Sequence, residues 1–263
     1  MPLCWAFVRQ GSPSVRRLQV VVAVSAVVVM SVAGLAGCQP VKGTSSDSAS
    51  GGSTATSTAS GGSGGGDGGG SAAAKALDGL TVHPKGSMTG YDRLKFGPAW
   101  TDNNDDPGGH NHCDTRNDIL ARDLTGISYK SGHCTIATGN LQDPYTGRTI
   151  HFVRGPESTK VQIDHVVPLG DAWVTGAAQL TATQRLDLAE DPLELIAADG
   201  PANEAKGDDD ASEWLPANTG YQCRYVARQI AVKVKYKLWV TSTEKSAMQH
   251  VLGTCPDQQL PTE

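Results

Sequence analysis

The amino-acid sequence predicts an α+β fold stapled by two disulfides. One observation is an order of elements: a β-branched run at 161–167, a capped helical insertion, a short apolar run at 193–197 and a short helix. A second is an amphipathic segment at 221–239 that predicts C-terminal helices, and a third is an even number of cysteines around these elements. The region 161–207 has neither a Gly-rich phosphate loop nor a G-x-S-x-G elbow, which argues against nucleotide-binding and α/β-hydrolase folds.

Residues 1–37 have the pattern of an export signal. Two arginines precede a nearly unbroken apolar run from Leu18 to Ala36, and small residues end it, as is typical of secretory signals. The Leu-Ala-Gly sequence directly before Cys38 resembles a bacterial lipoprotein signal, in which Cys38 becomes the lipidated first residue. An uncleaved membrane anchor is the alternative, because the run is near the length that spans a bilayer. Both readings place the protein outside the cytoplasm, anchored to a membrane or secreted.

Residues 38–78 are expected to form a disordered linker, because Gly, Ser, Thr and Ala dominate them and cannot bury enough apolar surface to offset chain entropy. Residues 79–255 suffice for one domain with a sizeable core, and 256–263 form a C-terminal tail. Removing residues 1–37 takes away three arginines and no acid, so the net charge falls from −5 to −8. Binding of nucleic acid by bulk positive charge is therefore excluded, and any phosphate-binding surface must be local.

Local signals predict the elements one by one. Thr115 as N-cap, Asp118 in the first turn and Gly126 as the stop predict a helix. The segment 143–147 has the Pro and Gly positions of a turn. Residues 149–153 alternate apolar and polar side chains, and we expect this strand to pair with the β-branched run that follows it. The remaining elements are a capping-box helix at 181–189, a strand at 193–197, a helix at 201–206 that ends at Gly207, a long helix at 221–239 and a last helix capped by Thr241 and Glu244.

Four cysteines lie in the exported domain, in a compartment that permits disulfides. Three pairings are possible, and we expect Cys113–Cys134 with Cys223–Cys255, because each closes a loop local to one half of the domain. A four-cysteine zinc site is the alternative, but no C-x-x-C pair is present. Three histidines near the first pair could suggest a second metal site, but polar loops explain them better: His110, His112 and His133.

The segment "VQIDHVVPLG", residues 161–170, ends a predicted strand with an acid and an imidazole. His165 can be neutral near pH 7 and accept a proton from water, as a general base must. Asp164 and Asn203 offer hard oxygen donors suited to Mg²⁺. Lys206 lies one helical turn after Asn203, where it can meet a phosphate. The plain alternatives are that Asp164 and His165 only end a buried strand and that Asn203 only caps a helix.

A basic stripe on the helix 221–239 offers the local positive surface that the acidic chain requires. Arg224 and Arg228 lie one turn apart on it, and Lys235 continues the stripe. We expect these side chains to contact substrate phosphates. A solvated helix face is the alternative. The acidic run 208–210 is expected to be solvated at the start of the next helix.

The ordered set of motifs resembles a known family. "IDHVVPL" followed by N-x-x-K-G resembles the HNH, or ββα-metal, endonucleases. The wider blocks look like the secreted HNH family related to the C-terminal domain of GmrSD-type restriction enzymes: "CDTRNDILARDL", "LQDPYTGRTIHF", "DHVVPLGDAW", "NEAKGDDDASEWLP" and "CRYVARQIAVKVKYKLWV". This resemblance covers about residues 79–255, which is essentially the whole predicted domain.

The resemblance implies a ββα-metal core with Asp164 and Asn203 on one divalent metal, Mg²⁺ or else Mn²⁺. It implies that His165 activates the water that attacks a phosphodiester, leaving a 5′-phosphate. Glu194 stands where the family's middle Asn orients the histidine; it either holds the imidazole or is a plain exposed strand residue. The implied function is a monomeric extracellular endonuclease that cuts DNA with low sequence specificity and has no evident protein partner, with RNA as a second candidate substrate.

Two other function classes are alternatives. One is a non-catalytic surface lipoprotein that binds a ligand or envelope partner on the same scaffold, for which Glu194 leaves room. The other is a cell-wall hydrolase, which needs paired acids across a cleft or a zinc-type histidine set, and the sequence offers neither.

Overall fold

A computed structural model describes residues 71–261. The predicted signal, the lipidation site Cys38 and most of the predicted linker lie outside the described residues. The elements are α1 (Ala72–Gly79), η1 (Arg93–Phe96), α2 (Thr115–Asp123), β1 (Leu124–Tyr129), β2 (Ile136–Gln142), β3 (Thr149–Val153), η2 (Ser158–Lys160), β4 (Val161–His165), α3 (Leu169–Val174), η3 (Ala177–Gln179), α4 (Ala182–Glu190), β5 (Leu195–Asp199), α5 (Gly200–Lys206), α6 (Thr219–Lys235) and α7 (Ser242–Leu252). The predicted α+β class is confirmed. No helix within 71–261 has the length and apolarity to cross a membrane.

The strands form two separate antiparallel sheets. One has the order β1-β2-β3, and the other is the pair β4-β5, in which Asp164 lies opposite Ile196 and His165 opposite Leu195. The predicted pairing of the 149–153 strand with the run after it is wrong, because β3 pairs with β2 instead. The tight turn at 143–147 joins β2 to β3 as a hairpin, so the nearest partner of β3 precedes it in the chain.

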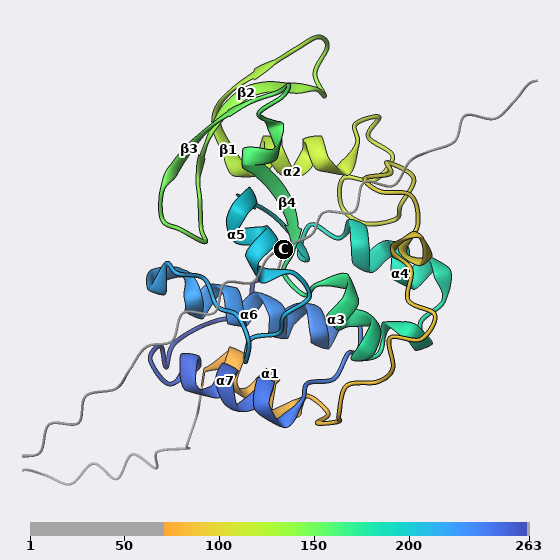
Figure 1. The fold of residues 1–263 in the computed structure, drawn as a ribbon, viewed down its shortest axis with the longest axis vertical. Coiled ribbons are helices and arrows are strands. Elements are labelled where there is room, and N and C mark those ends of the chain that lie inside the picture. The colour runs from red at the N-terminus through yellow and green to blue at the C-terminus, as the bar shows by residue number, and fades with distance from the viewer. Residues whose placement is uncertain (1–70, 262–263) are drawn as a thin grey trace, which may run out of the picture. The chain divides into compact units, whose positions relative to one another are not determined.

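Helix α2 packs between the two sheets (Figure 1). Its N-cap is Asp114, whose carboxylate accepts from the backbone N–H of Asn117, and the chain enters β1 before the predicted stop at Gly126. The buried side chains of Ile119 and Leu120 join a core with residues of both sheets. This helix therefore fixes β4 and β5 against the larger sheet.

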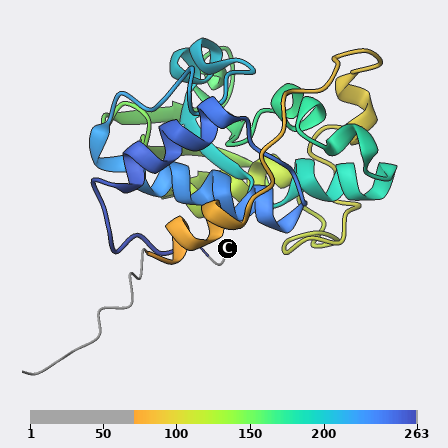
Figure 2. The same ribbon diagram turned by 90° about the horizontal axis from the view of Figure 1, so that it is seen from below.

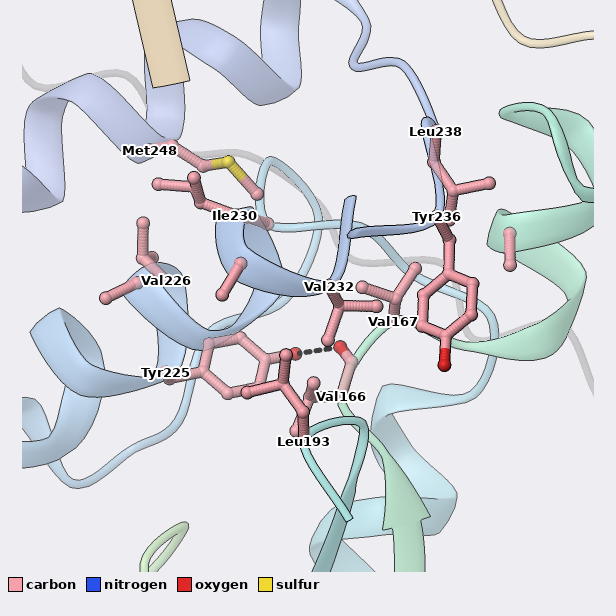
Figure 3. Close-up of a cluster of buried hydrophobic side chains, with 14 of the residues drawn as sticks. Val166, Val167, Leu193, Tyr225, Val226, Ile230, Val232, Tyr236, Leu238 and Met248 are labelled. Atoms are coloured by element: carbon pink, nitrogen blue, oxygen red, sulfur yellow. Dashed lines mark hydrogen bonds between the residues drawn. The ribbon is translucent and has the colours of Figure 1, made fainter. Parts of the chain in front are cut away.

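A second core lies between the β4–β5 pair and the C-terminal helices. Figure 3 shows Val166 and Leu193, which flank the strand ends, facing side chains of α6, with the Tyr225 hydroxyl 3.4 Å from the Val166 carbonyl oxygen. Figures 1 and 2 show α7 and α1 packed on the far side of α6. Helix α1 is capped by Ser71, so the folded part begins before the predicted boundary at residue 79.

Local chemistry produced the elements that the sequence predicted best. The capping boxes at Thr181 and Thr241 both form and open α4 and α7. Helix α3 was not predicted, because all of its residues are buried and it has no amphipathic period. Both predicted disulfides are confirmed: Cys113–Cys134 and Cys223–Cys255.

Candidate active site

The end of β4, helix α5 and the turn after α5 line one pocket of about 270 Å³. Asp164, His165 and Asn203, which the sequence singled out, all line it. Asp208 and Arg93 line it as well. The structure therefore brings together three predicted site residues that are separated by up to about forty positions in the chain.

His165 is held by its backbone surroundings and by an aromatic ring. Its Nε2 lies 3.0 Å from the carbonyl oxygen of Ala189, and the ring stacks on Trp100 with centroids 5.8 Å apart. Because a carbonyl only accepts, Nε2 carries the hydrogen and Nδ1 is the nitrogen with a free lone pair. Burial, the positive charge of Arg93 and that of Lys206 lower the pKa of His165 to about 3, although the Ala189 contact opposes them. The imidazole is therefore neutral near pH 7, as a proton acceptor must be.

Glu194 does not contact the imidazole, contrary to the expectation that it holds the ring, and it is not an exposed strand residue either. Its side chain is fully buried, and its Oε2 accepts from the backbone N–H of Val167 at 3.1 Å. Burial raises the pKa of Glu194 well above its ordinary value, while the Val167 N–H and Lys206 oppose the shift. Glu194 thus fixes the backbone that follows His165, and the Ala189 carbonyl holds the ring.

Lys206 differs from its predicted role as a phosphate contact. Its side chain is fully buried, and its ammonium donates to both carboxylate oxygens of Asp164 at 2.8 and 3.0 Å and to the carbonyl oxygen of His165 at 2.7 Å. The Tyr145 hydroxyl donates to the same carboxylate. A lysine at this spacing turns inward because an otherwise unpaired buried carboxylate is costly.

Asn203 and Asp208 supply the remaining oxygen donors of the pocket. The Asn203 amide nitrogen donates to the Gln162 side-chain oxygen at 2.9 Å. This hydrogen bond does not involve the Asn203 amide oxygen. Asn203 is not the helix cap, because Asp199 caps α5 by accepting from a backbone N–H. Asp208 approaches α3 closely: a Cβ at Gly170 would lie 2.5 Å from its carboxyl group. The glycine therefore makes room for this acid.

The two arginines of the predicted phosphate stripe do not line this pocket. Arg228 donates to the carbonyl oxygens of Leu193 and Pro192, both at 2.7 Å, so it fixes the loop before β5. Arg224 lies over the ring of Tyr221, 5.3 Å from its centroid, and lines a separate pocket of about 530 Å³. Helical spacing predicted their shared face but could not predict which neighbours that face meets.

No sequence pattern pointed to Arg93, Trp100 or Ala189. Each lies far from the "DH" motif in the chain and reaches the site only through tertiary packing. Cys113, Cys134 and His133 cluster elsewhere with potential ligand atoms within 4.8 Å of one another, but the two sulfurs are joined in a disulfide and are not thiolate ligands.

Comparisons with known proteins identify the family of this chain. Residues 114–251 match the family described as GmrSD restriction endonucleases, C-terminal domain. A protein of Arthroderma benhamiae, described as an uncharacterized secreted protein, is 41% identical over 185 residues, which cover 70% of this chain and 84% of that protein. No solved structure was found to match. The chain therefore belongs to the family of GmrSD restriction endonuclease C-terminal domains.

Proposed function

We propose that the protein is a metal-dependent endonuclease that hydrolyses phosphodiester bonds of DNA, with RNA as a second candidate substrate, with low sequence specificity and outside the cytoplasm. The observation that carries this proposal is the pocket itself. A neutral His165 with a free Nδ1 lies beside the oxygen donors of Asp164, Asn203 and Asp208. Membership of a nuclease family supports the same reaction class.

We infer that β4, β5 and α5 form the ββα-metal core of this endonuclease. Two antiparallel strands followed directly by a helix support this assignment. The first strand ends in Asp164 and His165, and the helix carries Asn203. Residues 166–194 are the insertion between the strands, and Ala189 within it reaches back to the imidazole.

The donor set fits a divalent cation such as Mg²⁺ or Mn²⁺, because carboxylate and amide oxygens are hard ligands. Asp164 and Asn203 would hold it, with Asp208 as a further carboxylate in the pocket. When bound, the cation supplies charge neutralisation for the phosphate and the departing oxygen. Lys206 donates to both oxygens of Asp164, so the buried carboxylate is already paired with a positive charge of the protein itself.

The side chains suggest how the reaction proceeds. Nδ1 of His165 takes a proton from water as the water oxygen attacks phosphorus, and the bond from phosphorus to the 3′ oxygen breaks. The products are a 5′-phosphate and a 3′-oxygen that is protonated from solvent. The Ala189 carbonyl, as acceptor of the Nε2 hydrogen, stabilises the positive imidazolium formed in this step. Trp100 keeps the ring plane fixed.

The test is plasmid nicking by the soluble domain with Mg²⁺, with Mn²⁺ and with chelator, beside His165→Ala. We expect cation-dependent nicking in the wild type and a loss of at least about a hundredfold in the variant, since general bases contribute on the order of 10²–10⁴ in rate. Nicking that persists unchanged in His165→Ala would overturn the mechanism.

A second candidate is a non-catalytic surface lipoprotein that binds a ligand or envelope partner. The observation that favours it is the buried Lys206–Asp164 pair, which already satisfies the carboxylate. Titration calorimetry distinguishes the two candidates. Mg²⁺ or Mn²⁺ binding that disappears in Asn203→Ala supports the nuclease, whereas no binding to the wild type supports the scaffold.

We further propose that Cys38 is lipidated and anchors the domain outside the cytoplasm. Two disulfides and the secreted relative support an extracytoplasmic location. In Cys38→Ala, we expect the protein to move from the membrane fraction to the soluble fraction. Retention in the membrane would instead indicate an uncleaved apolar anchor.

A further inference from the structure

Arg93 is a basic side chain at the candidate active site that forms no close ion pair with any residue in 71–261. It lines the pocket that holds Asp164 and Asn203, and it also lines a smaller neighbouring pocket on the Trp100 side of His165. Within residues 71–261, its guanidinium takes part in no ion pair and no hydrogen bond. By contrast, the buried ammonium of Lys206 donates hydrogen bonds to Asp164 and to the carbonyl oxygen of His165.

The backbone that carries Arg93 is firmly seated on α4. The Asp92 carboxylate accepts from the N–H of Leu94 at 2.9 Å and caps η1, and Phe96 is buried. Arg185 of α4 donates to the carbonyl oxygen of Lys95 at 2.9 Å. The turn is therefore held at the rim of the pocket while the guanidinium itself stays exposed to solvent.

The segment is tied down again just downstream. The N–H of Trp100 donates to Glu190 at the end of α4, at 2.9 Å. Gly97 allows the chain to lie close to Leu186, because a Cβ there would be 2.5 Å from a leucine methyl carbon. Residues 93–100 thus form a fixed strap over α4 that brings a cation and an aromatic ring to the same histidine.

We propose that Arg93 binds a non-bridging phosphate oxygen of the nucleic acid in this pocket, as a substrate-binding residue. A guanidinium offers a planar pair of N–H donors that matches two phosphate oxygens, which an ammonium cannot do. This inference rests on the proposed nuclease function and assigns the phosphate contact to a residue that precedes the family match at 114–251. Arg93 takes the role of phosphate contact that was predicted for Lys206.

Binding tests the proposal independently of cleavage. A fluorescein-labelled DNA duplex is titrated, in anisotropy measurements with chelator present, against the His165→Ala domain and the same domain with Arg93→Gln. We expect Arg93→Gln to weaken binding about tenfold and to reduce the slope of log affinity against log salt by about 0.9, the value for one lost phosphate contact.

Lys95 provides the matched control. It has the same charge and lies on the same turn, but its ammonium lies over the Trp173 ring, 5.1 Å from the centroid, and it lines neither pocket. Lys95→Ala should bind with the wild-type slope. If Arg93→Gln binds as tightly and with the same slope as its parent, the proposal is overturned whatever the cleavage result.

Cleavage gives the second readout. With Mg²⁺, we expect Arg93→Gln to lose on the order of 10²-fold in kcat/KM, as when one charge-stabilising donor is removed, and Arg93→Lys to recover part of it. A substrate with one neutral methylphosphonate at the cleavage site should lower the cleavage rate of the wild type but add little to the loss already caused by Arg93→Gln. If the two losses add, Arg93 does not contact that phosphate. If the wild type does not cleave but its DNA binding depends on Arg93, the nuclease function is contradicted and the phosphate contact is still supported.

Discussion

Lys206 is the residue whose environment departs most from its sequence pattern. Its ammonium is the buried counter-ion of Asp164, so Lys206→Met leaves a buried carboxylate with only the Tyr145 hydroxyl. We expect the free energy of unfolding to fall by about 3–5 kcal/mol, the usual cost of breaking a buried pair. Urea denaturation measures this fall. The double variant Asp164→Asn/Lys206→Met should recover most of the loss, and a double loss equal to the sum of two large single losses would contradict the pairing.

Glu194 should make stability depend on pH. Below about pH 4.5, its carboxyl group is protonated in both states. As the pH rises, the unfolded carboxyl ionises while the folded one keeps its raised pKa and its proton, so the folded state loses relative stability, by at most about 1.4 kcal/mol per pH unit. Glu194→Gln keeps an oxygen for the Val167 N–H and does not ionise. Its stability advantage over the wild type should therefore grow as the pH rises above about 5 in urea titrations. An advantage that does not change with pH would show that Glu194 is ionised in the fold.

For single residues, the sequence predicted which side chains lie at the site but not which groups they contact. Asp164, His165 and Asn203 share a pocket because a strand end and a helix carry them, and such placement follows from local patterns. Which groups Lys206 and Glu194 contact depends on which face of the β4–β5 pair packs against the second core. No local sequence pattern encodes that choice. The same holds for Arg93, which arrives from a segment with no regular periodicity.

Among the elements, η1 is the one whose placement should matter most for the site. Gly97 follows it with φ 92°, and a Cβ there would strike Leu186, so Gly97→Ala combines backbone strain with overlap. We expect this variant to lose about 1–3 kcal/mol of stability, mainly from the backbone strain because the end of the Leu186 side chain can move aside, and to displace Arg93. Thermal denaturation and the DNA anisotropy measurement check the two effects.

Gly132 is the control for a glycine of positive φ that has no close neighbour. It also has a positive φ, 66°, but nothing lies within 4 Å of the position a Cβ would take. Gly132→Ala should cost about 1 kcal/mol and leave DNA binding unchanged. A loss in Gly132→Ala as large as that in Gly97→Ala would contradict the special cost expected at Gly97.

Elements with strong local signals were predicted well, whereas α3 and β2, which depend on tertiary packing, were missed. Helices α4 and α7 begin at capping boxes, whose hydrogen bonds involve only nearby residues. Strand β2 carries Gly139 and Asn140, which are poor strand formers, and was missed because its partners β1 and β3 stabilise it from both sides. The wrong pairing of β3 followed directly from missing β2.

For the whole domain, the two disulfides should be a large part of its stability. They close loops with sequence separations of 21 and 32 residues, for which chain entropy predicts about 3–4 kcal/mol each. Removing either pair by double Cys→Ser substitution should lower the thermal midpoint, and a reducing agent should lower that of the wild type by both amounts together. A wild type that melts identically with and without reductant would contradict this contribution.

The positions of the disulfides also bear on how the domain can be cut into fragments. The family match begins one residue after Cys113 and ends four residues before Cys255, so a fragment trimmed to 114–251 keeps one cysteine of each pair. Cys134 and Cys223 would then be two orphan thiols, free to pair with each other or between molecules. Such a fragment also lacks Arg93, Trp100 and α1. An inactive or aggregated 114–251 fragment would therefore not contradict the proposed nuclease function. A recombinant fragment should start at Ser71 or earlier.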